Sequence, residues 1–286
     1  MGKKVFITGM TGNVGSEVAH ALYKMGYPFS AGVRNIRQAR EIFGSQYEYV
    51  EFDFLNPSTY AGALAGSDKL FLIRPPALAD FRRQIRPFLD FAVQAGVKRI
   101  VFLSLMGVER NPIPPHYRIE KYIRSLQIPY TFLRPSFFMQ NLHQAHCEDI
   151  KKRSNIYIPA GRAKISFIDT RDIGEIGAKV FWDPIHENQA YTLTGQDALN
   201  YEQVAEIFTS VLGRKIIYAN PSPFAFRKAM IGRGVDKKYV NVMVALYLTT
   251  RMGMAKAVSA DTADLLGRAP GTVRNYVQDY ARYWEE

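Results

Sequence analysis

Short apolar runs alternate with amphipathic stretches along the first 135 residues of the chain. The apolar runs predict buried strands at residues 5–7, 29–33, 49–52, 69–73, 99–104 and 130–133. The stretches between them predict helices at residues 16–25, 36–43, 57–64, 79–95 and 116–126. Such alternation is typical of right-handed βαβ units, so we expect an α/β fold built on a doubly wound parallel sheet.

A glycine turn separates the first predicted strand from its helix. Without a β-carbon, Gly9 can turn sharply, Gly12 can let the backbone touch a pyrophosphate, and Gly15 can let the helix lie against the sheet. Backbone amides at the start of the helix then face the phosphates. The predicted phosphate-binding residues are Gly9, Thr11, Gly12, Asn13, Val14 and Gly15. We favour a Rossmann nucleotide site over the alternative, a purely structural turn.

The alternation of strands and helices stops after Pro135. Short strands are expected at residues 165–168 and 189–193, helices at 171–181 and 201–212, and mostly helical structure after Pro223. We therefore predict a nucleotide-binding domain at residues 1–155 and a smaller, mostly helical, substrate-side domain at 156–286. Residues from about 165 to 195 are expected to pack back on the Rossmann sheet.

Composition narrows the class of protein. The chain has 286 residues, of which 47% are apolar, so we expect a packed core. It has no membrane-spanning apolar run and no signal peptide, which predicts a cytoplasmic protein with no membrane partner. One cysteine, Cys147, excludes an internal disulfide. The net charge of +11 suits anionic ligands, but the basic residues are scattered, so nucleic acid is not a favoured partner.

Arg34 ends the second predicted strand, where NAD-binding proteins place a carboxylate for the ribose hydroxyls. A guanidinium there would attract a 2′-phosphate, which predicts NADP(H) in preference to NAD(H). The alternative is that Arg34 only caps the strand end. Asp53, with Phe54 behind it, either accepts a hydrogen bond from the adenine amino group or caps the next helix. Arg74 is expected near the phosphates or the ribose.

Several motifs together resemble the NmrA-like branch of the atypical short-chain dehydrogenases/reductases. They are ITGMTGNVG (7–15), VRN (33–35), HYRIE (116–120), YTFLRP (130–135), FMQN (138–141) and FIDTRDI (167–173). The resemblance covers nearly the whole chain and implies a Rossmann fold that binds NADP(H). It implies either a quinone reductase or azoreductase, or a redox sensor that binds nucleotide without turnover and regulates a transcription factor.

Tyr117 and Lys121 have the Tyr-x-x-x-Lys spacing of the superfamily's catalytic dyad. The resemblance implies another register, because the lysine position of related enzymes falls 18 residues before Arg134, at His116 (134 − 18 = 116). The dyad tyrosine would then fall at Pro112, which has no acidic proton. His116 is therefore the candidate beside the nicotinamide, able to hydrogen-bond a carbonyl and to titrate near neutral pH. The alternative is a histidine that orients a loop; Tyr117 and Lys121 remain weaker candidates.

Further residues are candidates for contacts with the acceptor. Ser104 either contacts the substrate or the nicotinamide ribose or forms a turn. Phe137 and Phe138 either line a flat apolar pocket or pack in the core, and Asn141 either orients a substrate carbonyl or caps a loop. No metal is expected, because the histidines near Cys147 lack a second pair of ligands.

These observations favour an NADP(H)-dependent oxidoreductase that transfers a hydride to a quinone-like or other aromatic acceptor. Such a reaction does not require a protein acid, since solvent can supply the proton. The alternative is a catalytically silent NADP(H) sensor that acts on a regulatory protein partner. Either protein is expected as a monomer or a homodimer.

Overall fold

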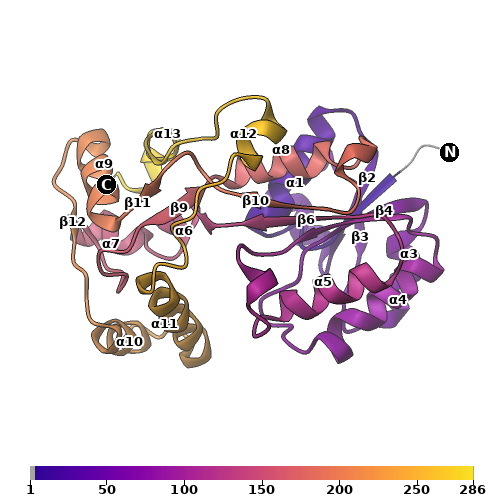
Figure 1. Cartoon of the computed structure of the whole chain (residues 1–286), viewed down its shortest axis with the longest axis horizontal. Coiled ribbons are helices and arrows are strands. Elements are labelled where there is room, and N and C mark those ends of the chain that lie inside the picture. The colour runs from indigo at the N-terminus through magenta and orange to yellow at the C-terminus, as the bar shows by residue number, and fades with distance from the viewer. Residues whose placement is uncertain (1–3, 286) are drawn as a thin grey trace. The chain divides into compact units, whose positions relative to one another are not determined.

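The computed structural model describes residues 4–285, which form two compact units (Figure 1). The first unit contains the chain up to Pro135 together with Thr170–Leu193. The second contains Ser136–Asp169 and the chain from Thr194 onward. The chain therefore leaves the first unit after Pro135 and returns to it at Thr170. Compared with the expected ranges 1–155 and 156–286, residues 136–155 belong to the second unit and Thr170–Leu193 to the first.

A seven-stranded sheet forms the centre of the first unit, with the order β10-β6-β5-β4-β1-β2-β3. Every neighbouring pair in it is parallel, which confirms the predicted doubly wound α/β sheet. The strands are β1 (Lys4–Ile7), β2 (Phe29–Val33), β3 (Tyr49–Glu51), β4 (Ser67–Leu72), β5 (Arg99–Leu103), β6 (Tyr130–Pro135) and β10 (Gln189–Leu193). The order changes direction at β1, and ligands of open α/β sheets bind at such a point.

Helices cover both faces of this sheet. Helices α1 (Asn13–Lys24) and α8 (Thr170–Lys179) lie on one face, and α3 (Tyr60–Leu64), α4 (Arg86–Gln94) and α5 (Pro115–Ser125) lie on the other (Figure 1). The remaining helical segments are α2 (Ile36–Phe43), η1 (Pro57–Thr59), η2 (Phe81–Ile85), η3 (Val108–Arg110) and η4 (Pro184–His186). A β-carbon on Gly174 would lie 2.5 Å from the β-carbon of Glu17, so α8 packs on α1 without room for a side chain there.

The helix predicted over residues 79–95 is irregular in its first turns. Its start is a π-helical segment, η2, before the regular helix α4. The Asp80 side chain accepts hydrogen bonds from the backbone amides of Arg82 and Arg83, which fixes the start, and Pro87 stands in the first turn of α4. A proline lacks the amide that an unbroken helix would use, so α4 begins afresh at Arg86.

The second unit is mostly helical, as expected. Its helices are α6 (Asn141–Gln144), α7 (Cys147–Arg153), α9 (Tyr201–Leu212), α10 (Pro223–Gly232), α11 (Lys237–Arg251), α12 (Asp261–Leu266), α13 (Val273–Asp279) and η5 (Ala281–Tyr283). It also contains a three-stranded sheet of order β11-β9-β7 and a two-stranded parallel sheet of β12 and β8. These strands are β7 (Phe137–Phe138), β8 (Asn155–Ile156), β9 (Ile165–Ile168), β11 (Ala198–Leu199) and β12 (Ile217–Tyr218).

Candidate nucleotide-binding and catalytic site

The glycine turn lies between β1 and α1, at the carboxyl end of the sheet. Gly9 has φ +67°, a conformation that favours glycine, and a β-carbon there would lie 3.0 Å from the β-carbon of Ile73. The Gly12 amide donates a hydrogen bond to the Gly9 carbonyl oxygen at 3.0 Å, which closes the turn. Gly12 is then the N-cap of α1, so the helix begins at Asn13 and not at the predicted residue 16.

Gly12 and Gly15 differ in what a side chain would meet. A β-carbon on Gly15 would lie 2.2 Å from the Gly9 carbonyl oxygen, so the first turn of α1 packs directly on the glycine turn. A β-carbon on Gly12 would come no closer than 3.4 Å to that same oxygen, which is ordinary contact. Packing therefore requires glycine at position 15, while the chain leaves open space beside Gly12.

The start of α1 is suited to an anion. No side chain caps the helix, and its first turn carries no acidic residue, so its amides and its dipole are not neutralised by the chain itself. Thr11 is exposed and Asn13 is half-buried beside these amides, while Val14 is buried in the core. Their role in binding phosphate stays a prediction.

Thr8, which the sequence analysis did not single out, fastens the turn to the neighbouring strand. Its buried hydroxyl accepts a hydrogen bond from the Ile73 amide at 2.7 Å and donates to the Ile73 carbonyl oxygen at 3.0 Å. A polar residue at the end of an apolar run, just before Gly9, is the signal that could have identified it.

Arg34 follows β2 directly and is exposed. The cap of α2 is its neighbour Asn35, whose side chain accepts a hydrogen bond from the Gln38 amide at 3.0 Å. Within residues 4–285, Arg34 forms no ion pair, so its guanidinium is available to an anionic ligand at the carboxyl end of the sheet.

Asp53 does not cap the next helix, and that alternative is wrong. Its side chain accepts a hydrogen bond from the Leu55 amide at 2.8 Å, while the cap of η1 is Asn56. Phe54 is buried, and its ring packs edge-on against that of Phe88, with centroids 5.3 Å apart. In this structure Phe54 is part of the core of the first unit.

The guanidinium of Arg74 binds backbone carbonyl groups of the loop that follows it, residues 75–78. Its Nη1 donates hydrogen bonds to the carbonyl oxygens of Pro75, Pro76 and Leu78 at 2.8–3.0 Å. Burial lowers the pKa of this arginine. These bonds use only Nη1, and the buried Nε has no hydrogen-bond partner among the described residues, so the contact with a bound nucleotide stays a prediction.

His116 lies in the first turn of α5 and is mostly buried. Its ring stacks on that of Phe102, with centroids 5.9 Å apart and planes at 27°, and its Nδ1 has no hydrogen-bond partner among the described residues. Burial, and then the nearby charge of Arg74, lower the pKa of His116 to about 3. The expectation of a titration near neutral pH is therefore wrong: at pH 7 the imidazole is uncharged and can act only through hydrogen bonds.

Two further residues of the recognised motifs form a buried ion pair. The Nε and Nη2 atoms of Arg134 donate to the two carboxylate oxygens of Glu120 at 2.9 and 2.6 Å. The hydroxyl of Ser104 also donates to Glu120, at 2.6 Å. The hydroxyl hydrogen of Ser104, which was predicted to contact substrate or ribose, is thus donated to a residue of the protein. Ser104, Glu120 and Arg134 together join α5 to the ends of β5 and β6.

Tyr117 and Lys121 follow His116 on α5. Tyr117 is half-buried and Lys121 is exposed, and within residues 4–285 neither side chain makes a hydrogen bond or ion pair. The structure therefore does not assemble them into a dyad with one another.

The predicted acceptor contacts lie in the second unit. Phe137 and Phe138 form β7, which pairs with Phe167 and Ile168 of β9, and both rings are half-buried. Asn141 begins α6 and is half-buried as well. Across residues 4–285, no three His, Cys, Asp or Glu side chains gather as a metal site.

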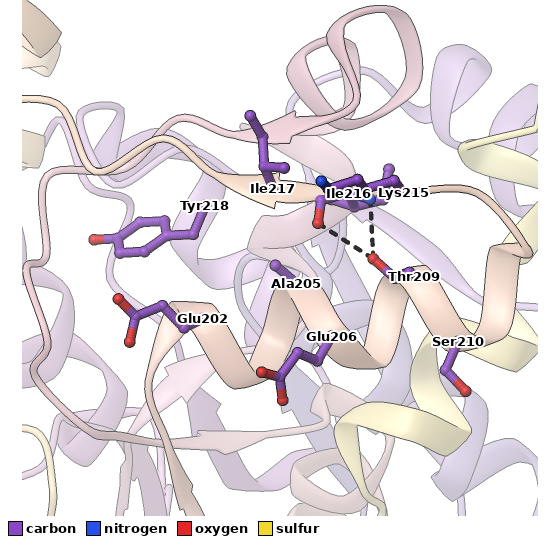
Figure 2. Close-up of a pocket in the computed structure, with 9 residues that line it drawn as sticks. All are labelled: Glu202, Ala205, Glu206, Thr209, Ser210, Lys215, Ile216, Ile217 and Tyr218. Carbon is purple, nitrogen blue, oxygen red and sulfur yellow. Dashed lines mark hydrogen bonds between the residues drawn. The ribbon is translucent and has the colours of Figure 1, made fainter.

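The second unit also has an open pocket of about 450 Å³ between α9 and β12 (Figure 2). Glu202, Glu206 and Thr209 line its helical side, and Lys215 to Tyr218 line the other. The Thr209 hydroxyl is held by the Ile216 backbone, at 2.9 Å from its nitrogen and 3.2 Å from its oxygen. None of the predicted site residues lines this pocket.

A doubly wound parallel sheet with a glycine turn between β1 and α1 defines a Rossmann-type nucleotide-binding protein. The chain belongs to the NmrA-like family, whose profile matches residues 1–276. The resemblance carried by the motifs is thereby confirmed.

Similar proteins include several reductases. The NAD(P)H azoreductase of Xenophilus azovorans is 31% identical over 285 residues, which cover 97% of this chain and 98% of that protein. The triphenylmethane reductase of Citrobacter sp., solved with NADP(H), is 25% identical with a TM-score of 0.86, covering 97% and 99% of the two chains. The NADPH-dependent quinone oxidoreductase of Escherichia coli, solved with NADPH, is 26% identical with a TM-score of 0.86, covering 96% and 99%.

Proposed function

We propose that this protein is an NADP(H)-dependent oxidoreductase that transfers a hydride to a quinone-like or other aromatic acceptor. The observation that carries the proposal is the turn from Gly9 to Gly15, which leaves uncapped amides and open space above Gly12 at the start of α1. Reduced nicotinamide, when bound, supplies the hydride. The three reductases to which the chain is similar support this class of reaction.

Arg34 supports the choice of NADP(H) over NAD(H). It is exposed, follows β2 directly, and has no carboxylate partner within residues 4–285. A guanidinium in this position would bind a 2′-phosphate through charge-assisted hydrogen bonds, whereas an unphosphorylated ribose would gain little from it. We also propose that Asp53 contacts the adenine.

His116 is proposed as a neutral hydrogen-bonding group for a carbonyl of the acceptor. A pKa of about 3 makes it unsuited to donate a proton as an imidazolium at pH 7, so the proton that completes quinone reduction would come from solvent. Phe137, Phe138 and Asn141 remain proposed contacts of the acceptor, since flat apolar side chains with one polar group suit an aromatic carbonyl compound.

The test is NADPH oxidation, followed in steady state with a panel of small quinones, an azo dye and a triphenylmethane dye. We expect turnover with at least one acceptor, and slower turnover when NADH replaces NADPH. Nucleotide binding measured by calorimetry without turnover of any acceptor would support the alternative, a redox sensor that acts on a protein partner. Absence of nucleotide binding would contradict both.

A further inference from the structure

Helices α10 and α11 lie side by side in the second unit and, with the loop to residue 258, form the segment 223–258 (Figure 1). This segment holds one acidic residue, Asp236, and seven basic residues, so it carries +6 of the net charge of +11. The basic residues are Arg227, Lys228, Arg233, Lys237, Lys238, Arg251 and Lys256. Charge that looks scattered along the whole sequence is therefore concentrated here.

The same segment concentrates exposed apolar side chains. Of the sixteen large apolar residues that are exposed within residues 4–285, eight lie in it. They are Phe224, Tyr239, Val242, Leu246, Leu248, Met252, Met254 and Val258. Single exposed apolar residues are common on protein surfaces, but half of those described within one segment of 36 residues indicates an interaction surface.

Helix α11 has apolar residues on two of its faces. Val240, Met243 and Tyr247 are buried in the core of the second unit. Tyr239, Val242 and Leu246 follow one another at helical spacing on another face, where they are 52%, 64% and 46% exposed. A helix that needed only to cover its own core would carry polar residues on that outer face.

Most of the basic side chains of the segment have no ion-pair partner within residues 4–285. Arg233 pairs with Asp149 of α7 at 2.8 Å. Arg227 of α10 donates to Asn241 of α11 at 2.9 Å and so joins the two helices. Lys228, Lys237, Lys238 and Lys256 are exposed and form no ion pair within the described part of the chain. Their charges are thus available to an external anion.

We propose that the segment 223–258 is a docking surface for an anionic lipid membrane. Apolar side chains flanked by lysines suit a bilayer interface, where the side chains enter the headgroup region and the lysines meet anionic headgroups. No helix within residues 4–285 is long and apolar enough to cross a bilayer, so contact is confined to the surface. The sequence-based expectation of no membrane partner considered spanning segments alone.

Other occupants fit this surface less well. A symmetric contact with a second copy would place +6 against +6. A nucleic acid would leave the apolar side chains against phosphates. A small acceptor would cover only part of α11, whose 15 residues extend over roughly 22 Å.

The test is co-sedimentation of the full chain with vesicles of phosphatidylcholine alone and of phosphatidylcholine mixed with phosphatidylglycerol, at low and at high salt. We expect binding to the anionic vesicles only, weakened by salt. The variants Lys237→Glu with Lys238→Glu, and Val242→Glu with Leu246→Glu, are each expected to weaken it at least tenfold. The matched controls Arg82→Glu with Arg83→Glu, and Ile185→Glu, change exposed residues of the first unit and should bind as the wild type does.

Several outcomes would overturn the proposal. They are equal binding to neutral vesicles, no binding at low salt, an equal loss in the control variants, or size-exclusion data in which the α11 variants dissociate a dimer. The two lysine changes touch no described partner, so they leave the fold intact if the Val242 and Leu246 variant fails to fold. Lipid binding is measured without nucleotide or acceptor, so its failure is independent of the proposed oxidoreductase activity.

Discussion

The carbonyl oxygen of Gly9 lies 2.2 Å from the position that a β-carbon on Gly15 would occupy. The same oxygen lies 3.4 Å from a β-carbon placed on Gly12. Two positions of one motif are therefore occupied by glycine for different physical reasons. Packing of α1 on the turn requires Gly15, whereas at Gly12 the chain itself has room for a methyl group.

Gly12→Ala is expected to abolish nucleotide binding while the free energy of unfolding stays within about 1 kcal/mol of wild type, because within the chain the added methyl group meets only the Gly9 carbonyl oxygen, at an ordinary contact distance. Gly15→Ala should lower that free energy by roughly 1–3 kcal/mol through overpacking. Calorimetric titration with NADPH and urea unfolding check both. Gly62→Ala is the control, since nothing lies within 4 Å of its added carbon. Unchanged affinity in Gly12→Ala would contradict the proposed phosphate site.

Arg34→Gln is expected to weaken NADPH binding about tenfold or more and to leave NADH binding nearly unchanged, because only NADPH carries the 2′-phosphate. Dissociation constants for both nucleotides measure the ratio. Arg37→Gln serves as the control, since this arginine is also exposed but pairs with Glu41 at 3.2 Å. An equal loss for the two nucleotides would assign Arg34 another role.

His116→Leu is expected to lower kcat about tenfold, the effect of losing one hydrogen bond to the reacting acceptor. With its pKa lowered to about 3, His116 should contribute no inflection to the pH profile of kcat between about pH 5 and 8. His116→Gln, which keeps a hydrogen-bonding group, should recover part of the rate, and Tyr117→Phe should behave as wild type. A larger loss in Tyr117→Phe or Lys121→Ala than in His116→Leu would shift the catalytic role to those residues.

His146 predicts a loss of stability in acid. It is fully buried, its Nε2 lies 2.8 Å from the Tyr247 hydroxyl, and burial lowers its pKa from the ordinary 6.5 to about 4. In the unfolded chain the imidazole of His146 is protonated below about pH 6.5, whereas in the folded chain it stays neutral down to about pH 4. Stability should therefore fall by up to about 3 kcal/mol between these pH values, and His146→Gln should remove that part of the pH dependence. Urea unfolding at a series of pH values measures the slope. His20→Gln, at an exposed histidine whose pKa burial also lowers, is the control and should remove a smaller part of it.

Glu120→Ala is expected to cost about 3 kcal/mol of unfolding free energy, because it leaves the buried guanidinium of Arg134 without its bidentate partner. Glu109 lies 3.2 Å from Arg134 and offsets part of the loss. The control is Glu41→Ala on the exposed pair with Arg37, which should cost under about 1 kcal/mol. A cost for Glu120→Ala as small as the control's would show that this buried pair adds little to stability.

Local sequence was a reliable guide for strands buried along their whole length, for a strongly capped helix, and also for the partly exposed edge strand β10. Strands β2, β9 and β10 and helix α9 have the expected bounds, and α9 begins with a capping box between Asn200 and Gln203. The start of α1 was placed too late because Gly12 serves both the turn and the cap. Strands β7, β8 and β11 have two residues each, too few to leave a periodic pattern.

The candidate site was less predictable because its properties depend on tertiary contacts. The glycine turn and Arg34 could be identified from their spacing in the sequence, because they face solvent or a ligand and do not depend on distant parts of the chain. The pKa of His116 depends on burial against Phe102 and on the charge of Arg74, which is near in space but far along the chain. The hydroxyl of Ser104 donates to Glu120, 16 residues along the chain. No local pattern contains that information.

The return of the chain at Thr170 has a consequence for biosynthesis. Edge strand β10 pairs with β6, and α8 packs through Gly174 on Glu17 of α1, yet both elements are translated after the first segment of the second unit. A nascent chain that has emerged only to Pro135 therefore exposes the unpaired edge of β6 and the apolar surface beneath α8. The ribosome must synthesise the chain as far as Leu193 before the seventh strand of the Rossmann sheet is present, so a fragment truncated earlier is expected to aggregate.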